Sequence, residues 1–372
     1  MFQTASNVPP GMRYHTGAEA RLRRAIIDVV MRVFDGWSYD EIITPSIDYY
    51  SLFERGMGQH EAEHAFRFTD TDGQLLTLRP DVTSAAARAA ATLLAESERP
   101  VRLCYVANVF RQRPRSRTEW RRESMQLGCE LIGRSEIVTD VEILNIAIEV
   151  LERLGLGQDF RITLNSMEIF NGVVEQLDFD AAAREQLHRL VAARDDAGLR
   201  RFLAQHAPSF AGHTLFSHQT QVSDKCETLL GACRETTNAR SLAALNSLES
   251  VWDILESSGL ANYFKIDFGD VSRLNYYTGL TFKIYVAGLG VCVGGGGRYD
   301  ELTGNFGRPE PAIGFVLDLD SLEEALTRRG LTLTPEHTRR SHSITIGQPV
   351  AMFSEARGRR GHGEHIRIGS KS

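Results

Sequence analysis

The chain has 372 residues, of which 42% are hydrophobic and 24% charged, so it can bury a core of ordinary globular size. Its 42 Lys and Arg residues against 48 Asp and Glu residues leave a formal net charge of −6, which provides no overall field attracting nucleic acid. Met1 to Arg13 lacks the basic start and apolar run of a signal peptide, and no stretch approaches the roughly 18 apolar residues of a membrane span. We therefore expect a cytoplasmic protein that binds neither membrane nor nucleic acid.

The cysteines are odd in number and show no paired Cys-x-x-Cys spacing, which is typical of reduced thiols and not of structural zinc. They are Cys104, Cys129, Cys226, Cys233 and Cys292.

His60 and His64 are four residues apart and could bind a metal from one face of a helix, but no third ligand is evident. Glu61 and Glu63 between them favour a solvated face. The sequence thus predicts neither a metal site nor a cofactor.

The first predicted helix begins with the T-x-x-E capping pattern of Thr16 and Glu19 and ends at Gly36. Its apolar residues recur on one helical face. They are Leu22, Ile26, Val29, Val30 and Val33.

A short extended segment, residues 41–44, ends at Pro45, which cannot donate a hydrogen bond to a sheet. Residues 65–69 and 75–78 are alternating runs on either side of turn residues 72–73. This pattern predicts a β-hairpin.

An alanine-rich helix is predicted from Asp81 to about Leu94, because alanine is the strongest helix former and aspartate is a good N-cap. Two strands follow, at residues 101–110 and 124–132. The arginine-rich segment between them, residues 111–122, is either solvated or faces an anionic ligand.

Thr139 and Glu142 form a second capping pattern, which opens a helix that ends before Gly155. From about residue 167 to 260 the pattern changes to polar helical segments. We interpret this stretch as a helical insertion.

Strand signals then return, and a helix at residues 321–329 follows them. Because few helices alternate with the strands, an α+β fold with a mostly antiparallel sheet is favoured over a doubly wound sheet. The predicted strands are residues 263–268, 280–286, 291–293 and 312–317. The resulting division is a core in two parts (1–166 and 261–330), the insertion (167–260) and a C-terminal tail (331–372) with too few apolar residues for a further domain.

Seven segments, in order, resemble the catalytic core of histidyl-tRNA synthetase, a class II synthetase. They are GWSYDEIITPSIDYYSLFERG, LTLRPDVT, VFRQRP, MQLGCELIG, NYYTG, GGRYDEL and AIGFVLDLDSL. The first segment, with the helix before it, looks like class II motif 1, the arginine-flanked strand pair looks like motif 2, and the last segment looks like motif 3. The resemblance covers roughly residues 8–325 and implies a class II antiparallel sheet flanked by helices. The synthetase ends in an anticodon-binding domain, of about a hundred residues, whereas only about forty residues follow the core here. A core without that domain resembles the regulatory subunit of the hetero-oligomeric ATP phosphoribosyltransferase.

The resemblance implies a site for free histidine and gives each candidate residue a role. The ammonium group would contact Asp81, Thr83 and Gln126; the imidazole would contact Glu130 and Tyr277; Tyr299 and Tyr276 would line the pocket, and Arg111 matches the arginine of motif 2. Asp81 replaces a longer glutamate of the family.

Local sequence alone leaves other interpretations open for these residues. Asp81 and Thr83 could cap a helix. Gln126 and Glu130 lie on the same face of a strand, which could simply face solvent, and the tyrosines could be core or edge aromatics.

Two cations that act on the nucleotide in the synthetase are replaced. The catalytic arginine falls on Ser272 and the motif 3 arginine on Ser321, while Gln112 stands where a glutamate would follow the motif 2 arginine. Losing one transition-state donor costs about 3 kcal/mol, or roughly 10² to 10³ in rate, so losing two would abolish useful adenylation. Arg273 is the only evident substitute, and as a neighbour along a strand it would point to the opposite face.

We therefore interpret the chain as a non-catalytic regulatory subunit, required for the activity and histidine feedback regulation of the first step of histidine biosynthesis. The resemblance implies L-histidine as ligand, a short-form catalytic ATP phosphoribosyltransferase subunit as partner, and a homodimer formed through motif 1 within a hetero-oligomer. The alternatives are a truncated histidine-activating ligase and a tRNA-binding paralogue.

Overall fold

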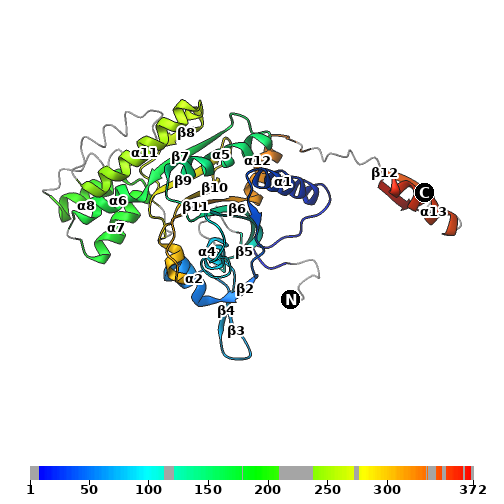
Figure 1. The fold of residues 1–372 in the computed structure, drawn as a ribbon, viewed down its shortest axis with the longest axis horizontal. Helices are drawn as coiled ribbons and strands as arrows, with labels where there is room; N and C mark the ends of the chain where they lie inside the picture. The colour runs from blue at the N-terminus through cyan, green and yellow to red at the C-terminus, as the bar shows by residue number, and fades with distance from the viewer. Residues whose placement is uncertain are drawn as a thin grey trace. The chain divides into compact units, whose positions relative to one another are not determined.

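The computed structural model describes residues 8–112, 121–177, 179–208, 238–271, 276–331, 333, 341–345, 349–362 and 365–369. The chain divides into two units, Met1–Leu331 and Thr332–Ser372 (Figure 1). None of the helices within these described ranges has the length and hydropathy of a membrane span.

An eight-stranded sheet forms the centre of the first unit, with strand order β1-β5-β6-β11-β10-β9-β7-β8 (Figure 1). Neighbouring strands are antiparallel except for the outermost pairs, β1 with β5 and β7 with β8, which are parallel. The strands are β1 (Asp40–Glu41), β5 (Val101–Phe110), β6 (Glu123–Ile132), β7 (Phe160–Ser166), β8 (Phe264–Ile266), β9 (Leu280–Val286), β10 (Cys292–Arg298) and β11 (Ala312–Asp318). The predicted α+β class with a mostly antiparallel sheet is confirmed.

Long amphipathic helices cover one face of this sheet. Helix α1 (Gly17–Gly36) packs against α5 (Ile137–Arg153) and α12 (Leu319–Arg328), and these contact β11 and β6 (Figure 1). The buried apolar residues of α1 follow helical spacing, as the sequence predicts. They are Ile26, Val30, Val33 and Phe34.

The opposite face of the sheet carries smaller elements. Helix α4 (Thr83–Ala91) lies against β6, and its alanines permit a close approach to the strands. Beside it lie α2 (Tyr50–Met57), the four-residue helix α3 (Gln59–Ala62) and the 3₁₀ helix η2 (Leu302–Phe306). A small sheet completes this side, in the order β2 (Ile47–Tyr49), β4 (Leu75–Leu78) and β3 (Arg67–Thr69), and β3 and β4 form the predicted hairpin.

The region predicted as an insertion is helical where the structure describes it. It contains α6 (Met167–Glu175), α7 (Ala181–Ala192), α8 (Asp196–His206) and α11 (Ala239–Ser257), followed by the 3₁₀ helix η1 (Ala261–Tyr263). Helix α11 packs on α6, α5 and β7, which joins this region to the large sheet.

The second unit has a β-α-β arrangement. Strands β12 (Ser341–Thr345) and β13 (His365–Gly369) are parallel and are connected through α13 (Pro349–Gly361). We expected a tail without a further domain here. Consistent with its few apolar residues, the described core of this unit is Ala356 with Ile366 packed against it.

The first helix has its predicted bounds, but both predicted capping boxes and the predicted end of the alanine-rich helix differ from the structure. Thr16 makes no side-chain capping bond, and Glu19 instead lies 2.8 Å from Nδ1 of His15. Helix α5 begins at Ile137, and the Thr139 hydroxyl donates to the carbonyl of Glu136, so the second capping box is also wrong. Helix α4 ends at Ala91 and not near Leu94.

Candidate functional site

A single cavity gathers the candidate residues that the sequence scatters over more than two hundred positions. All eight line it: Asp81, Thr83, Arg111, Gln126, Glu130, Tyr276, Tyr277 and Tyr299. The remaining wall is formed by Met57, Gly295, Gly314, Phe315 and Val316. The space between the walls, including the part open to solvent, is about 480 Å³.

The strand pairing explains why these residues meet. Gln126 and Glu130 point to the same face of β6, four residues apart. The start of α4 brings Thr83 above that face, where its hydroxyl donates to Oε1 of Glu130 at 2.8 Å. Tyr299, directly after β10, donates to Oε2 of the same carboxylate at 2.5 Å.

The Glu130 carboxylate is the most buried charged group of the cavity, with 1% of its surface exposed. Besides Thr83 and Tyr299, the hydroxyl of Tyr105 donates to it at 3.1 Å. Burial raises the pKa of Glu130 to about 7, although the three hydroxyls favour the charged form, and Asp81 adds to the increase. The carboxylate is thus fixed in position and close to its titration point at neutral pH.

Asp81 accepts local hydrogen bonds at the start of α4 and also lies in the cavity wall. It accepts hydrogen bonds from the backbone nitrogen of Ser84 at 2.9 Å and from the Ser84 hydroxyl at 3.1 Å, as a residue capping the first turn of α4 does. It also lines the cavity. The cap holds this second carboxylate in a defined orientation within the site.

Three tyrosines form an aromatic wall. The ring centroid of Tyr276 lies 4.7 Å from that of Tyr277 and 5.9 Å from that of Tyr299, the second pair edge to face. Burial raises the pKa of both Tyr276 and Tyr299 well above the ordinary value, so their phenols stay neutral and can donate hydrogen bonds.

Glycines make room for these side chains. A Cβ atom at Gly314 would overlap the Glu130 carboxylate, and one at Gly297 would come within 2.9 Å of the Tyr277 ring. Strand β10 contains four consecutive glycines, residues 294–297, and a Cβ at each would overlap a backbone oxygen of β9 or β11. The sequence predicted a close backbone approach here, but it placed the strand end at Val293, before the glycines.

Tyr105 is the polar contact that the sequence interpretation missed. It lies on β5 opposite Gly128 of β6, which is the glycine between Gln126 and Glu130 on the cavity-facing side of the strand. A Cβ at Gly128 would overlap the Tyr105 ring. A glycine flanked at i±2 by two polar residues was therefore the available signal, because the vacant position admits a side chain from the neighbouring strand.

Ser272 and Arg273, which bear on the lost catalytic arginine, lie outside the described residues. Ser321, at the position of the motif 3 arginine, lies in the first turn of α12. Its backbone nitrogen and its hydroxyl both donate to Asp318 at 2.7 Å. Asp318 pairs in register with Gln126, so this carboxylate lies at the edge of the site.

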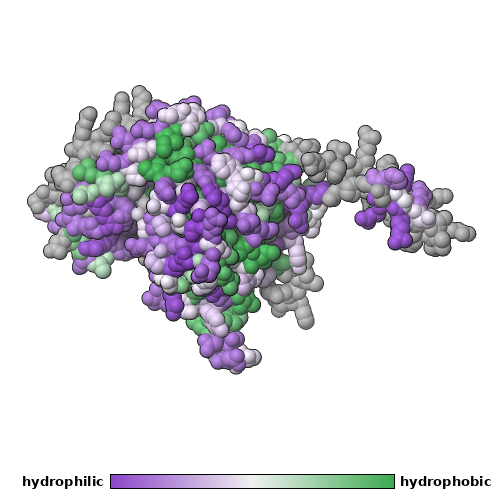
Figure 2. All heavy atoms as spheres, in the orientation of Figure 1, coloured by the Kyte–Doolittle hydropathy of each residue, from purple (hydrophilic) through white to green (hydrophobic). Residues whose placement is uncertain are grey.

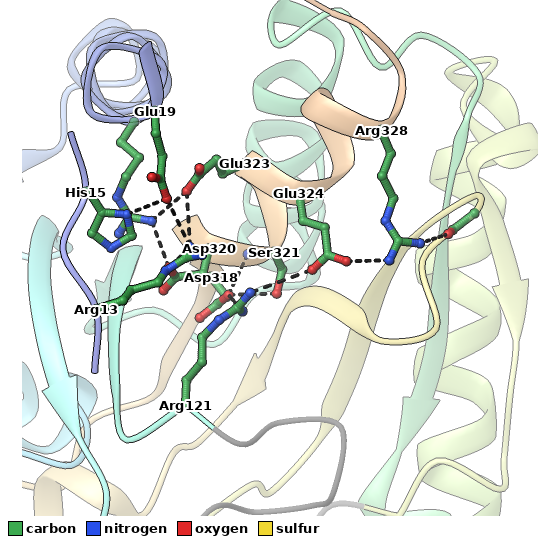
Figure 3. A network of polar contacts seen from close by, with 12 residues as sticks. Arg13, His15, Glu19, Arg121, Asp318, Asp320, Ser321, Glu323, Glu324 and Arg328 are labelled. Carbon is green, nitrogen blue, oxygen red and sulfur yellow. Dashed lines mark hydrogen bonds and ion pairs between the residues drawn. The ribbon is translucent and has the colours of Figure 1, made fainter. Parts of the chain in front are cut away.

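A network of acidic residues and arginines surrounds this helix start (Figure 3). Asp320 accepts from Arg23 at 2.8 Å and from Arg13 at 3.2 Å. Burial disfavours the charge on Asp320, but the neighbouring arginines outweigh it and lower its pKa. Arg121 lies 3.8 Å from Asp318 and 3.7 Å from Glu324 (Figure 3). The cations here neutralise carboxylates of the chain itself.

Among the described cysteines, Cys104 and Cys129 are buried and Cys292 is partly buried, while Cys226 and Cys233 lie outside the described residues. The reduced state of the cysteines stays a prediction.

Comparison with known proteins identifies the family. The model of the histidyl-tRNA synthetase family matches residues 11–322. Over 366 residues the chain is 33% identical to the ATP phosphoribosyltransferase regulatory subunit of Moorella thermoacetica, an alignment covering 98% of this chain and 92% of that protein. The chain belongs to the histidyl-tRNA synthetase family, among the ATP phosphoribosyltransferase regulatory subunits.

Solved structures of the regulatory-subunit and synthetase families share the fold. A Bacillus halodurans protein described as an ATP phosphoribosyltransferase regulatory subunit/histidyl-tRNA synthetase is 27% identical, with a TM-score of 0.86, and the match covers 100% of this chain and 94% of that one. The histidyl-tRNA synthetase of a Nostoc species, 19% identical, has a TM-score of 0.79, with 98% of this chain and 86% of that chain covered. The class II architecture implied by the sequence motifs is confirmed.

Proposed function

We propose that this chain is the regulatory subunit of a cytoplasmic ATP phosphoribosyltransferase and that it binds free L-histidine in the cavity around Glu130. The observation that carries the proposal is the meeting of two buried carboxylates, Asp81 and Glu130, with neutral tyrosine phenols in one cavity. An amino acid with an ammonium group and a ring N–H needs acceptors at two points, and these carboxylates provide them.

The surroundings of Ser321 support a role without adenylation. The N-terminus of a helix such as α12 attracts phosphate because its first N–H groups are unsatisfied. Here the Asp318 carboxylate already accepts from the Ser321 nitrogen, and the carboxylates of Asp320 and Glu323 beside it are paired with Arg13 and Arg23. A nucleotide phosphate at this place would meet carboxylates where the synthetase has an arginine.

Assembly is part of the proposal. The expected partner is a short-form catalytic subunit that transfers the phosphoribosyl group to ATP, and histidine bound here would report to it through differential affinity for two states of the complex. We also propose a homodimer through motif 1. Ile43 is 87% exposed and Ile47 48% exposed, and Figure 2 shows hydrophobic surface over the region of β2 and β5.

Calorimetry of histidine binding, with Glu130→Ala as the variant, tests the site. Loss of an imidazole partner should weaken histidine binding and should also weaken feedback inhibition in the complex with the catalytic subunit. If inhibition is unchanged while the complex stays assembled, histidine acts at another place, such as the interface between the subunits.

The enzymatic alternative has its own assay. Histidine-dependent exchange of pyrophosphate into ATP, measured on the purified chain, should be absent. Exchange at an enzymatic rate would instead establish a truncated histidine-activating ligase. Salt-sensitive binding of tRNA would favour the tRNA-binding paralogue.

A further inference from the structure

A second cluster of ligand-forming side chains lies outside the cavity. His60, Glu61 and His64 each offer one donor atom, and these three atoms lie within 4.8 Å of one another. The order of the residues is His-Glu-x-x-His, a spacing that places two imidazoles on one face of a helical turn.

Backbone hydrogen bonds explain why the two rings meet although α3 has only four residues. The nitrogen of Glu63 donates to the carbonyl of Gln59, and the winding continues as a tighter turn through His64 and Ala65. His60 and His64 therefore face the same side, with ring centroids 5.6 Å apart. Ala62 and Ala65 are fully buried and anchor the turn.

The third donor is where the structure departs from the sequence expectation of a solvated face. Glu61 is 9% exposed, and its carboxylate lies 3.7 Å from Nδ1 of His60. The His60 side chain is 77% exposed, so a change of its rotamer toward the shared position meets little packing.

We propose that His60, Glu61 and His64 form a binding site for a divalent transition-metal ion such as Zn²⁺. Zinc–nitrogen bonds of about 2.0–2.1 Å in a tetrahedral site place ligand atoms roughly 3.3 Å apart, so a modest rotation of the exposed His60 ring brings the donors into range. Three protein ligands leave one coordination position for water or an external ligand.

A second described cluster of this kind, His15 with Glu19 and Glu323, is a poorer site. Glu323 already accepts from Arg23 at 2.8 Å, so an ion would have to displace a guanidinium. The His60 cluster is also connected to the cavity. The backbone nitrogen of Gln112 donates to the carbonyl of His64 at 2.7 Å, and Gln112 directly follows Arg111, which lines the cavity. An ion held there would fix one support of the histidine cavity.

The test uses the untagged full-length chain, freed of metal, and no free L-histidine is added. Zn²⁺ is titrated in competition with a chromophoric chelator, and the visible spectrum of bound Co²⁺ reports the ligand geometry. We expect one saturable equivalent, with affinity reduced at least about tenfold in His60→Ala and in His64→Ala, since loss even of groups that only support ligands costs 10- to 100-fold. Glu61→Gln should weaken binding as well.

His362→Ala is the matched control, because His362 is an exposed histidine of the second unit that should not contribute. Thermal unfolding of His60→Ala should match that of the parent chain, since the side chain is exposed. Equal affinity in the parent chain and in His60→Ala, or no saturable equivalent in the parent chain, overturns the proposal. If the chain does not bind L-histidine, the proposal of a metal site is not affected, because this test measures metal binding alone.

Discussion

The hydroxyl of Tyr105 lies 3.1 Å from Oε1 of Glu130, and it reaches that carboxylate across the vacant side-chain position of Gly128. Thr83 from α4 and Tyr299 from the end of β10 complete the set of donors. Three hydroxyls from separate elements thus hold one buried charge, and the position of Glu130 depends on the packing of α4 on the sheet.

Tyr105→Phe should weaken histidine binding about tenfold with little change in fold. Removing a hydrogen bond to a charged group costs about 1.5–3 kcal/mol, and Glu130 would lose one of the contacts that orient it. Tyr39→Phe is the matched control, because Tyr39 is a buried tyrosine whose hydroxyl donates to Glu142 at 2.9 Å away from the cavity. Calorimetry should show unchanged affinity in the control. Equal losses in both variants would mean that general destabilisation is responsible.

Glu130→Gln should alter how stability depends on pH. With the pKa of Glu130 raised from 4.5 to about 7 in the folded state, the unfolded chain releases this proton first as the pH rises. The contribution of the Glu130 proton to the free energy of unfolding is therefore fully present below about pH 4.5 and is lost by about pH 7, a change of about 3 kcal/mol. Glutamine does not titrate.

Urea unfolding at a series of pH values measures this difference. Between about pH 4.5 and pH 7.5 the free energy of unfolding of Glu130→Gln should rise relative to the parent chain by an amount of that order. Parallel curves for the two proteins over this window would contradict the raised pKa of Glu130.

Gly314→Ala should abolish histidine binding and destabilise the fold. The new methyl group would overlap the Glu130 carboxylate and come within 2.5 Å of the carbonyl of Cys129, and overpacking of this kind costs about 1–3 kcal/mol. Gly290→Ala is the control, because a Cβ there meets no atom within 4 Å and its backbone is not left-handed. The control should keep the histidine affinity of the parent chain, measured by calorimetry, and its unfolding temperature. Full histidine affinity in Gly314→Ala would place the ligand elsewhere.

Ile43→Arg should shift the chain from dimer to monomer, since a charge would be buried in the proposed interface without a partner. Leu93→Arg is the control, because Leu93 is 85% exposed but follows α4, in a segment distant in sequence from motif 1. Sedimentation velocity over a range of concentrations distinguishes the two states. A dimer that survives in Ile43→Arg, or one that dissociates in Leu93→Arg, would contradict the motif 1 interface.

The central sheet and the pocket could largely be predicted from the sequence because their signals are redundant. The strands of residues 101–110 and 280–286 have the predicted bounds, and the family motifs selected eight residues that do share one cavity. The alternation of apolar and polar residues and the order of the motifs can be recognised in the sequence itself, without knowing which strands are neighbours in the sheet.

Contacts between distant segments could not be predicted. Tyr105 contacts Glu130 only through the register of β5 with β6. The capping patterns at Thr16 and Thr139 failed because other side-chain and backbone groups compete for the same bonds. Local sequence states which groups can bond, and tertiary structure decides which of them do.

Strand β10, with its four glycines, makes formation of the cavity depend on formation of the whole sheet. Glycine has low β-propensity and a large conformational entropy to lose, so residues 294–297 have little tendency to become extended on their own. Their order depends on hydrogen bonds to β9 on one side and β11 on the other. One wall of the cavity therefore forms only when the whole sheet has formed. An amino acid bound there would stabilise the sheet as a unit, so it should slow global unfolding of the core more than local opening of single segments.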